Sequence, residues 1–184
     1  MLFKTHKRFA SALLVTFVLA AIAAGPAVEA QEVAVGGANA TVLAVLAVTS
    51  VQDLNFGNVL QGVPASADID VIAEAGDFQV TGAASTEVAL YLQLPEFLWN
   101  STNTDRMIIS FGSTDCEVDT LITATAAAKS GNETVEDPYN ITAVTLGGGG
   151  GAHLFLAGSV YPAVDQAVGA YAGDIVLTAA YTGN

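Results

Sequence analysis

The feature that most constrains this chain is a succession of short apolar runs interrupted by turn residues. Beyond residue 40, Val, Ile, Leu, Thr and Tyr recur in runs separated by Gly, Asn, Asp, Ser and Pro, with no long stretch at helical spacing. We therefore expect an all-β domain folded as an antiparallel β-sandwich. The expected strands are residues 40–49, 53–60, 67–73, 78–82, 87–94, 106–111, 117–125, 141–146, 152–161 and 174–181.

Two of these runs differ in how their apolar residues alternate. In the last run, one face carries Ile175, Leu177, Ala179 and Tyr181, and we expect it to face the core. Residues 41–48 (TVLAVLAV) are apolar on both faces, which is unstable at an exposed sheet edge. This run is predicted to be either a central strand of a complete sandwich or a strand covered by another copy. In the second case the partner's groove would be filled by Val42, Ala44, Leu46 and Val48.

The first thirty residues have the layout of a secretory signal peptide. Three of the five basic residues lie within the first eight positions, ahead of an apolar stretch over residues 9–24. Small residues predict cleavage after Ala30, which leaves one domain over residues 31–184. A membrane anchor is the alternative, but this stretch is shorter than the roughly 20 residues of a spanning helix. We expect an exported protein in the periplasm, on the cell surface or outside the cell, with no membrane span in the mature chain.

The charge of the chain excludes one large class of partners. The sequence has 5 Lys and Arg residues against 18 Asp and Glu residues, a formal net charge of -13. Beyond Ala30 only Arg106 and Lys129 are basic, and the formal charge becomes -15. Because nucleic-acid binding depends on many basic side chains that neutralise phosphates, we expect no nucleic-acid partner. Anionic membrane surfaces are disfavoured for the same reason.

Candidate catalytic groups are scarce beyond the leader. The one histidine there, His153, stands in an apolar strand, and the G-x-S-x-G motif of a serine nucleophile does not occur. We therefore expect a structural role for His153, no catalytic residues, no cofactor and no enzymatic activity. Cys116 is the only cysteine, so it is a buried thiol, a reactive thiol or half of an intermolecular bridge. We favour the buried thiol.

Alternating carboxylates are the remaining candidates for a binding site. Asp115, Glu117 and Asp119 would point from one face of a strand, and oxygen ligands in that arrangement could hold calcium. The solvated face of an edge strand explains the same pattern, and no D-x-[DN]-x-[DN]-G loop accompanies it. We assign no metal site and keep these three residues as the candidate calcium ligands.

Two segments are predicted to be connections between strands. Residues 126–140 are mostly polar, so we expect a flexible loop in which Lys129 is the more accessible trypsin site. Residues 147–151 are five consecutive glycines, but neither a Lys-Ser/Thr pair nor a helical pattern follows them, so they do not predict a phosphate-binding loop. We expect a hinge or a hairpin turn.

Three stretches resemble a known bacterial family. Residues 38–59 contain Leu54-Asn55-Phe56-Gly57 after a strand, and residues 78–82 read Phe-Gln-Val-Thr-Gly. Residues 169–181 contain Gly-x-Tyr-x-Gly followed by an alternating strand that ends on Tyr181. Together they resemble the secreted family called domain of unknown function 4402. The resemblance implies an immunoglobulin-like and pilin-like fold without catalytic residues, glycines at Gly57 and Gly173 that are free to take positive φ, and Phe56, Tyr171 and Tyr181 as core or corner aromatics.

These observations favour one function over another. We expect a non-catalytic exported bacterial structural protein, a fimbrial, pilus-type or cell-surface subunit whose partner is itself or a related subunit. The alternative is a periplasmic or secreted binding module for glycan or calcium. Self-association separates the two, because a subunit forms oligomers or filaments whereas a module stays monomeric and saturates with its ligand.

Overall fold

The computed structural model describes residues 36–183. The predicted signal peptide and its cleavage point lie outside these residues. The chain divides into two parts, residues 1–40 and residues 41–184, and of the first only the exposed residues 36–40 are described. Within residues 36–183, no helix is long and apolar enough to cross a membrane.

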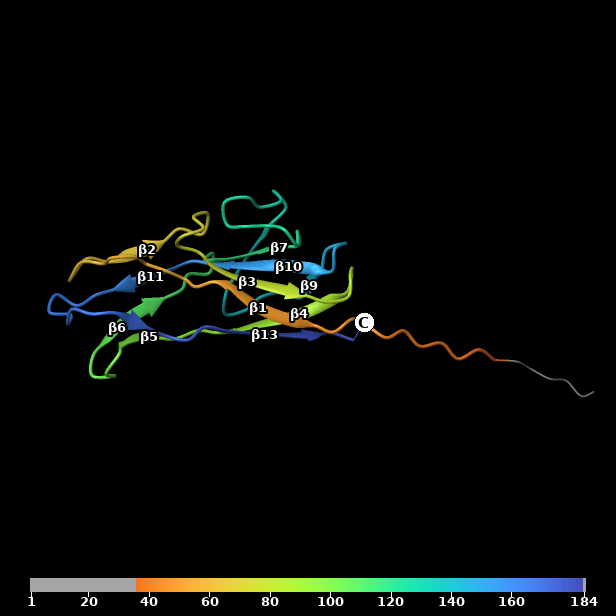
Figure 1. Ribbon diagram of the computed structural model, residues 1–184, viewed down its shortest axis with the longest axis horizontal. Helices are drawn as coiled ribbons and strands as arrows, with labels where there is room; N and C mark the ends of the chain where they lie inside the picture. Colours follow the sequence, from red (N-terminus) through yellow and green to blue (C-terminus); the bar gives the residue numbers. More distant parts are fainter. Residues whose placement is uncertain (1–35, 184) are drawn as a thin grey trace, which may run out of the picture. The chain divides into compact units, whose positions relative to one another are not determined.

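The described residues of the second part form thirteen strands, most of which are labelled in Figure 1. Every pairing between these strands is antiparallel. The predicted all-β class and antiparallel pairing are therefore confirmed. The strands are β1 Ala47–Gln52, β2 Ala65–Ala67, β3 Gly76–Thr81, β4 Glu87–Gln93, β5 Phe97–Asn100, β6 Arg106–Ser110, β7 Cys116–Asp119, β8 Thr134–Glu136, β9 Val144–Thr145, β10 Gly151–Leu156, β11 Gly158–Tyr161, β12 Tyr171–Ala172 and β13 Val176–Tyr181.

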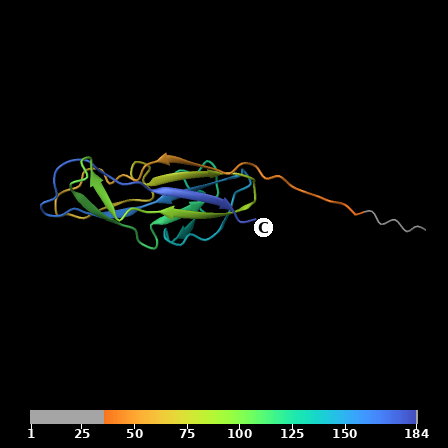
Figure 2. The same cartoon turned by 90° about the horizontal axis from the view of Figure 1, so that it is seen from below.

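The strands form three sheets that pack as a sandwich. The first sheet has the order β1-β3-β10-β7-β8, the second β12-β5-β6-β11-β2, and the third β13-β4-β9. Strand β10 leads into β11 of the second sheet after the single residue Ala157, and β4 of the third sheet leads into β5 after three residues, 94–96. Figure 2 shows β13 and β4 side by side. Strands that pass from one sheet to another form the corners of such sandwiches.

One apolar cluster fills the space between the sheets. The first sheet contributes alternate residues of β3, β7 and β10, while β4, β6, β11 and β13 contribute from the other side. In β4, burial alternates along the strand, with Val88, Leu90 and Leu92 buried and the residues between them exposed. The predicted alternation of the last strand is confirmed, because Leu177 is buried and Ile175, Ala179 and Tyr181 pack against the cluster.

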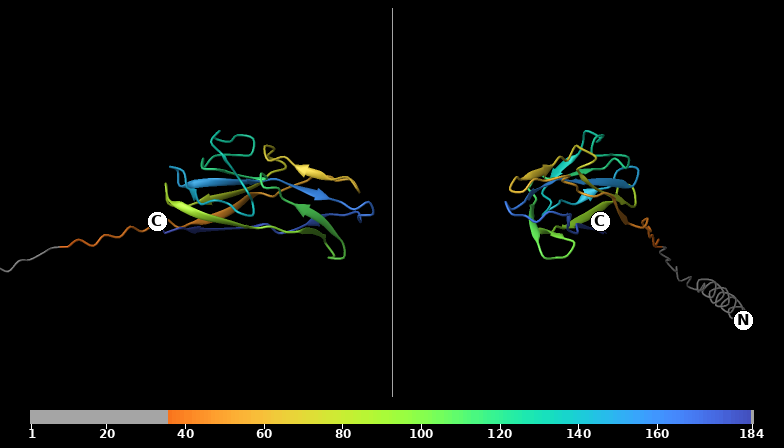
Figure 3. Two further views of the ribbon diagram at one scale, coloured as in Figure 1. Left: turned by 180° about the vertical axis from the view of Figure 1, so that it is seen from behind. Right: turned by 60° about the vertical axis from the view of Figure 1, so that its left-hand side comes forward.

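Strand β10 is buried on both faces. Leu154 and Leu156 point into the main cluster, whereas Phe155 packs on the opposite face against Ala75, Ala124 and Ala126. The connection between β7 and β8 supplies these last two alanines, and Figure 3 shows it rising over the sheet. A strand in this position has no solvated face, which explains why residues 152–157 are almost continuously apolar.

The N-terminal apolar run does not form a central strand. Strand β1 begins at Ala47, lies at the edge of the first sheet and pairs only with β3. Residues 41–46 precede it without regular secondary structure. Of the two alternatives for this run, the central strand is therefore wrong, and of the strand expected over residues 40–49 only residues 47–49 belong to a strand. Apolar content predicted burial, but which strand becomes an edge depends on pairings distant in sequence.

Other boundaries also differ from expectation. Residues 53–60 form no strand, and the strands expected over residues 67–73, 117–125 and 141–146 are reduced to short pieces at 65–67, 116–119 and 144–145. Strands β5, β8 and β12 were not expected, and β8 lies inside the connection predicted to be flexible. Each of these three is four residues or fewer, too short for alternation to identify it.

The five-glycine segment is a turn, as expected, but it joins two sheets. It connects β9 of the third sheet to β10 of the first, and Gly150 takes a φ of 73°. A Cβ atom on Gly147 would lie 2.1 Å from the carbonyl oxygen of Thr120, so the backbones approach too closely for any side chain. Of the two glycines expected at positive φ, Gly57 has φ 63°, whereas Gly173 does not take a positive φ.

Candidate functional site

The segment Thr41–Leu46 exposes apolar side chains to solvent. Val42 is 94% exposed and Val45 is 88% exposed, although each is followed by a further apolar residue. Single exposed apolar residues are common on protein surfaces, but a continuous apolar run with no cover is not. Exposed contiguous apolar surface of this kind marks a site of interaction.

Tyr181 fixes the point at which this segment leaves the sandwich. The Tyr181 hydroxyl donates to the carbonyl oxygen of Ala44 at 2.8 Å and accepts from the backbone N–H of Ala83 at 2.7 Å. Leu46 packs against the main apolar cluster. The last residue of β13 therefore holds the beginning of β1, and the expected role of Tyr181 as a corner aromatic is confirmed.

A groove with a volume of about 1100 Å³ opens beyond this anchored end. One wall is residues 53–59, which continue β1, and the other is residues 168–176, which lead through β12 into β13. Its floor consists of side chains of the main cluster: Phe78, Leu98, Met107, Ile109 and Val160. The groove therefore reaches the core, which is not closed on this side.

Both walls of the groove continue from sheet edges. Strand β1 ends the order of the first sheet, and β13 ends that of the third, so among the described residues each has one side without a hydrogen-bonded strand, although β1 and β13 contact one another. An edge of this kind presents backbone N–H and C=O groups that can pair with a further strand. Ser50 of β1 lines the groove and is exposed, since no strand covers it.

The two motif stretches that carried the family resemblance form these walls. Leu54 and Phe56 pack against the main cluster, and the side-chain oxygen of Asn55 accepts from the N–H of Gly57 at 2.9 Å. On the other wall, the Tyr171 hydroxyl donates to the Asp105 carboxylate at 2.7 Å, and its oxygen also lies 2.8 Å from the carbonyl oxygen of Ala167. The expected roles of Phe56 and Tyr171 are therefore confirmed.

The hydrogen bonds around Tyr171 also affect acid–base behaviour. Burial and the hydrogen bond to the Asp105 carboxylate raise the pKa of Tyr171. The hydrogen bond from Tyr171 lowers the pKa of Asp105, and the backbone N–H of Ala167 adds to this effect. Gln166 donates to the same carboxylate at 2.9 Å. This network fixes the loop before β12, and with it one rim of the groove.

Gly173 lies on the same wall for a steric reason. A Cβ atom at this position would come within 3.0 Å of Leu98 Cδ2 and 3.2 Å of the Phe97 carbonyl oxygen. The expectation of a positive φ at Gly173 is wrong, because close approach to β5 explains the glycine instead. The spacing of a glycine within a motif does not show whether the glycine is needed for a positive φ or for close approach to a neighbouring strand.

The residues predicted to mediate self-association have four different environments. Val42 is exposed, Ala44 is held through its carbonyl by Tyr181, Leu46 packs on the cluster and Val48 lies in β1. Sequence reasoning missed the groove itself, because its walls are more than one hundred residues apart in the chain. The motif glycines and aromatics were the only local signal that these stretches belong together.

The candidate calcium ligands have separate partners. Asp115 precedes β7 and accepts from the N–H of Gly112 at 2.7 Å, while Glu117 pairs with Lys129. Asp119 accepts from the N–H groups of Leu121 at 2.8 Å and Ser130 at 2.6 Å. Within residues 36–183, no group of three His, Cys, Asp or Glu side chains is placed to hold a metal ion.

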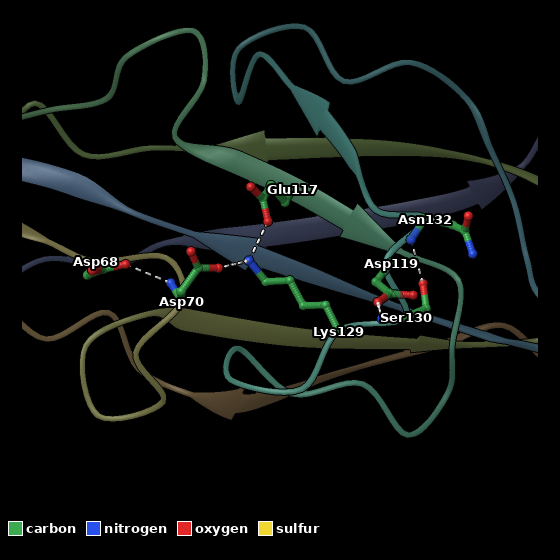
Figure 4. Close-up of polar contacts among 7 residues, drawn as sticks. All are labelled: Asp68, Asp70, Glu117, Asp119, Lys129, Ser130 and Asn132. Carbon is green, nitrogen blue, oxygen red and sulfur yellow. Dashed lines mark hydrogen bonds and ion pairs between the residues drawn. The ribbon is translucent and has the colours of Figure 1, made fainter.

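Of the three candidate ligands, Glu117 is bound by Lys129, which also reaches Asp70, as Figure 4 shows. Its ammonium group lies between Glu117 and Asp70, 2.6 Å from the Asp70 oxygen, and its side chain is only 7% exposed. Burial alone would lower the pKa of Lys129, but hydrogen bonds to Asp70 and Glu117 raise it. Burial likewise opposes ionisation of Asp119, yet hydrogen bonds from Ser130 and Leu121 lower its pKa. The expected accessibility of Lys129 is therefore wrong.

His153 is buried beside this cluster, under the same connection. Its Nδ1 lies 2.7 Å from Asp77, and its Nε2 lies 3.2 Å from the carbonyl oxygen of Ile122 and 3.1 Å from Gln79. Burial raises the pKa of Asp77, while His153 acts in the opposite direction. These contacts hold the β7–β8 connection on the sheet and support the structural role that we expected.

Comparison with known proteins adds no relative. The chain matches no protein-family model, no curated protein sequence and no solved structure. Its function must therefore be argued from the geometry above.

Proposed function

We propose that this chain is an exported, non-catalytic structural subunit of the bacterial cell surface, of the fimbrial type, which associates with further copies of itself. The sandwich would then be of the immunoglobulin-like, pilin-like type. The predicted leader over residues 1–30 and the resemblance to domain of unknown function 4402 support this proposal.

The observation that carries the proposal is the exposure of Val42 and Val45. Apolar surface in water costs roughly 25 cal/mol per Å², so an uncovered run of this length favours association. The adjacent sheet edges at β1 and β13 offer backbone groups that a further copy can use. Main-chain hydrogen bonds and buried apolar side chains together are the means by which strand addition achieves affinity.

The first prediction concerns the mass of the protein in solution. We expect light scattering to show an apparent mass that rises with concentration, and electron microscopy to show filaments on cells that express the chain. Replacing both valines (Val42→Asp, Val45→Asp) should reduce the apparent association constant at least about tenfold, because two charges would have to be buried on association.

The matched control is Val51→Asp. Val51 is an exposed valine of β1 that lies outside the apolar run of residues 41–46, so this variant adds a nearby charge and leaves Val42 and Val45 unchanged. If the unaltered protein keeps the mass of one copy at high concentration and the cells carry no filaments, the proposal is wrong. The binding-module alternative, for glycan or calcium, then takes its place.

A further inference from the structure

A second, smaller pocket lies on the outer face of the second sheet, beside Trp99. Trp99 is the only tryptophan of the chain, and it is 40% exposed. The pocket has a volume of about 520 Å³, within the range of roughly 300–1,000 Å³ that is usual for small-ligand sites. We infer that this pocket binds a sugar ring of a neutral glycan, stacked on the indole of Trp99. Such a site is independent of the proposed function, because self-association needs no glycan.

The register of the strands leaves one side of Trp99 open. Leu98 packs on the main cluster, so the side chains of Phe97 and Trp99 point to the opposite face of β5. Trp99 pairs with Arg106 of β6 on one side and with Ala172 of β12 on the other. Paired residues share a face of the sheet. Because the side chain of Ala172 is a single methyl group, the space beside the indole stays open there and forms the pocket.

Phe97 adds a second aromatic wall. Its ring centroid lies 6.5 Å from that of Trp99, and the two rings are inclined at 62°. The guanidinium of Arg106 lies 4.0 Å from the Phe97 ring centroid and would repel a cationic ligand at the same rings. A sugar ring with equatorial hydroxyls carries flat faces of C–H groups, which suit the electron-rich face of an indole. The two rings therefore favour an uncharged sugar over an ammonium ligand.

Polar groups surround this aromatic corner. Glu96, Asn103 and Asp174 line the pocket, and all three are exposed. Within residues 36–183, neither these three side chains nor the indole N–H of Trp99 have a hydrogen-bond partner. They offer carboxylate acceptors, an amide that donates and accepts, and an indole donor, a mixture that sugar hydroxyls can match because each hydroxyl donates and accepts. The two carboxylates would repel an acidic sugar.

The hairpin that carries Asn103 is ordered by its own hydrogen bonds. The side-chain oxygen of Asn100 accepts from the backbone N–H groups of Thr104 at 2.9 Å and Asp105 at 3.3 Å. The hydroxyls of Thr102 and Thr104 lie 2.8 Å apart and are hydrogen-bonded. Asn103 takes a φ of 54°, a conformation that asparagine adopts more readily than most residues. A pocket with fixed walls loses less conformational entropy when a ligand binds.

The fluorescence of Trp99 reports directly on the pocket, because the chain has no other tryptophan. The probes are two neutral hexasaccharides, one of β-1,4-linked glucose and one of β-1,4-linked N-acetylglucosamine, and the acidic hexamer of galacturonic acid. We expect at least one neutral hexasaccharide to shift the emission to shorter wavelength, with a dissociation constant of about 10 µM to 1 mM. The galacturonic acid hexamer should leave the emission unchanged.

A blocking variant keeps the reporter. Ala172→Leu fills the space beside the indole from an exposed position of β12, an edge strand of the second sheet. We expect this variant to bind the responsive hexasaccharide at least about tenfold more weakly, because the sugar can no longer stack on Trp99. Ala180→Leu is the matched control, since Ala180 is an exposed alanine of β13 that does not line the pocket. Thermal unfolding of each variant checks that it folds.

Calorimetry tests the side chains that would touch the sugar. Trp99→Ala should abolish the heat of binding, whereas Tyr91→Ala should preserve it, because Tyr91 is an exposed aromatic residue of the third sheet. Glu96→Gln keeps the shape of the side chain and removes its charge. This change should weaken binding by about fivefold to tenfold, because a hydrogen bond to a charged acceptor becomes a neutral one.

Each outcome decides for or against the site. If neither neutral hexasaccharide shifts the emission or releases heat, the glycan site is wrong. A response that Ala172→Leu retains in full places the binding elsewhere, and equal binding of the galacturonic acid hexamer contradicts a neutral ligand. If Ala172→Leu lowers the mass by light scattering while Ala180→Leu does not, the pocket is a contact between copies instead. An unaltered protein that binds the sugar but stays a single copy overturns the proposed function and leaves the glycan site standing.

Discussion

Lys129 and Cys116 illustrate how single residues are fixed by their surroundings. Lys129 is one of only two basic residues beyond Ala30, and its ammonium group is nearly buried between two carboxylates. Removing one partner of a buried ion pair lowers the free energy of unfolding by more than the intact pair contributes to it, because the other charge is left buried and unpaired. Loss of either Lys129 or Glu117 should therefore destabilise the fold. Cys116 is buried in β7, and its thiol faces the main cluster.

Cys116 is expected to be unreactive in the folded protein. Burial raises the pKa of its thiol to about 12, and the carboxylates of Glu136 and Glu117 add to this effect. At pH 8 the thiolate fraction falls about a thousandfold below that of an ordinary thiol, and access is blocked as well. Ellman's reagent at pH 8 should therefore react at least about a thousandfold faster in denaturant than in native buffer. A comparable native rate would show that Cys116 is accessible.

At the scale of elements, the β7–β8 connection shows how a polar loop can be ordered. Three groups of contacts hold it: Lys129 with its two carboxylates, Asp119 with two backbone N–H groups, and His153 with the carbonyl of Ile122. Its alanines cover Phe155 of β10. The connection therefore covers Phe155 on the outer face of the first sheet, and we expect these contacts to make it resistant to proteolysis.

Native trypsin digestion should leave the described chain uncut at Lys129. Its side chain is bound and buried, and cleavage requires the surrounding backbone to open. Glu117→Gln removes one carboxylate charge from Lys129, which should lower the unfolding free energy by about 1–3 kcal/mol and increase the cleavage rate several-fold. Mass spectrometry of the fragments identifies the cleaved bond. Asp115→Asn is the control, because Asp115 does not contact Lys129. Rapid native cleavage after Lys129 would contradict the described contacts.

At the scale of the whole molecule, charge opposes the proposed association. Each copy without its leader carries a formal charge of -15, so two copies repel one another as they approach. The exposed apolar run over residues 41–46, on which the proposed function rests, carries no charged side chain. Salt therefore acts on the repulsion between copies and has little effect on the contact, because the Debye length falls to about 8 Å at 0.15 M.

Self-association is accordingly expected to strengthen with ionic strength. Between 20 and 300 mM NaCl, the apparent dissociation constant should decrease by about tenfold as repulsion between the acidic surfaces is screened. Light scattering at fixed protein concentration and pH 7 measures this change. Sucrose at matched osmolality is the control for effects that do not depend on charge. An association that weakens with salt would indicate that ion pairs hold the copies together, contrary to the uncharged contact.

The sequence determined the class of fold and the character of its strands. Turn residues between short apolar runs predicted an antiparallel all-β chain, and the alternation of β4 and β13 appears in their burial. These features are local, because side chains alternate in direction along any strand. The burial of Cys116 and the structural contacts of His153 also followed from residue types and their neighbours.

The tertiary structure determines which strands lie at the sheet edges and that a groove opens between two of these edges. Nothing local distinguishes the apolar run before β1 from that of β10, yet one is exposed and the other is buried on both faces. Pairing partners distant in sequence make this difference. The groove also depends on distant partners, because its two walls are separated by more than one hundred residues in the chain. Lys129 is a third case, because its polar neighbours in the sequence suggested exposure although its side chain is nearly buried. Burial depends on three-dimensional neighbours, which pattern and spacing along one chain do not specify.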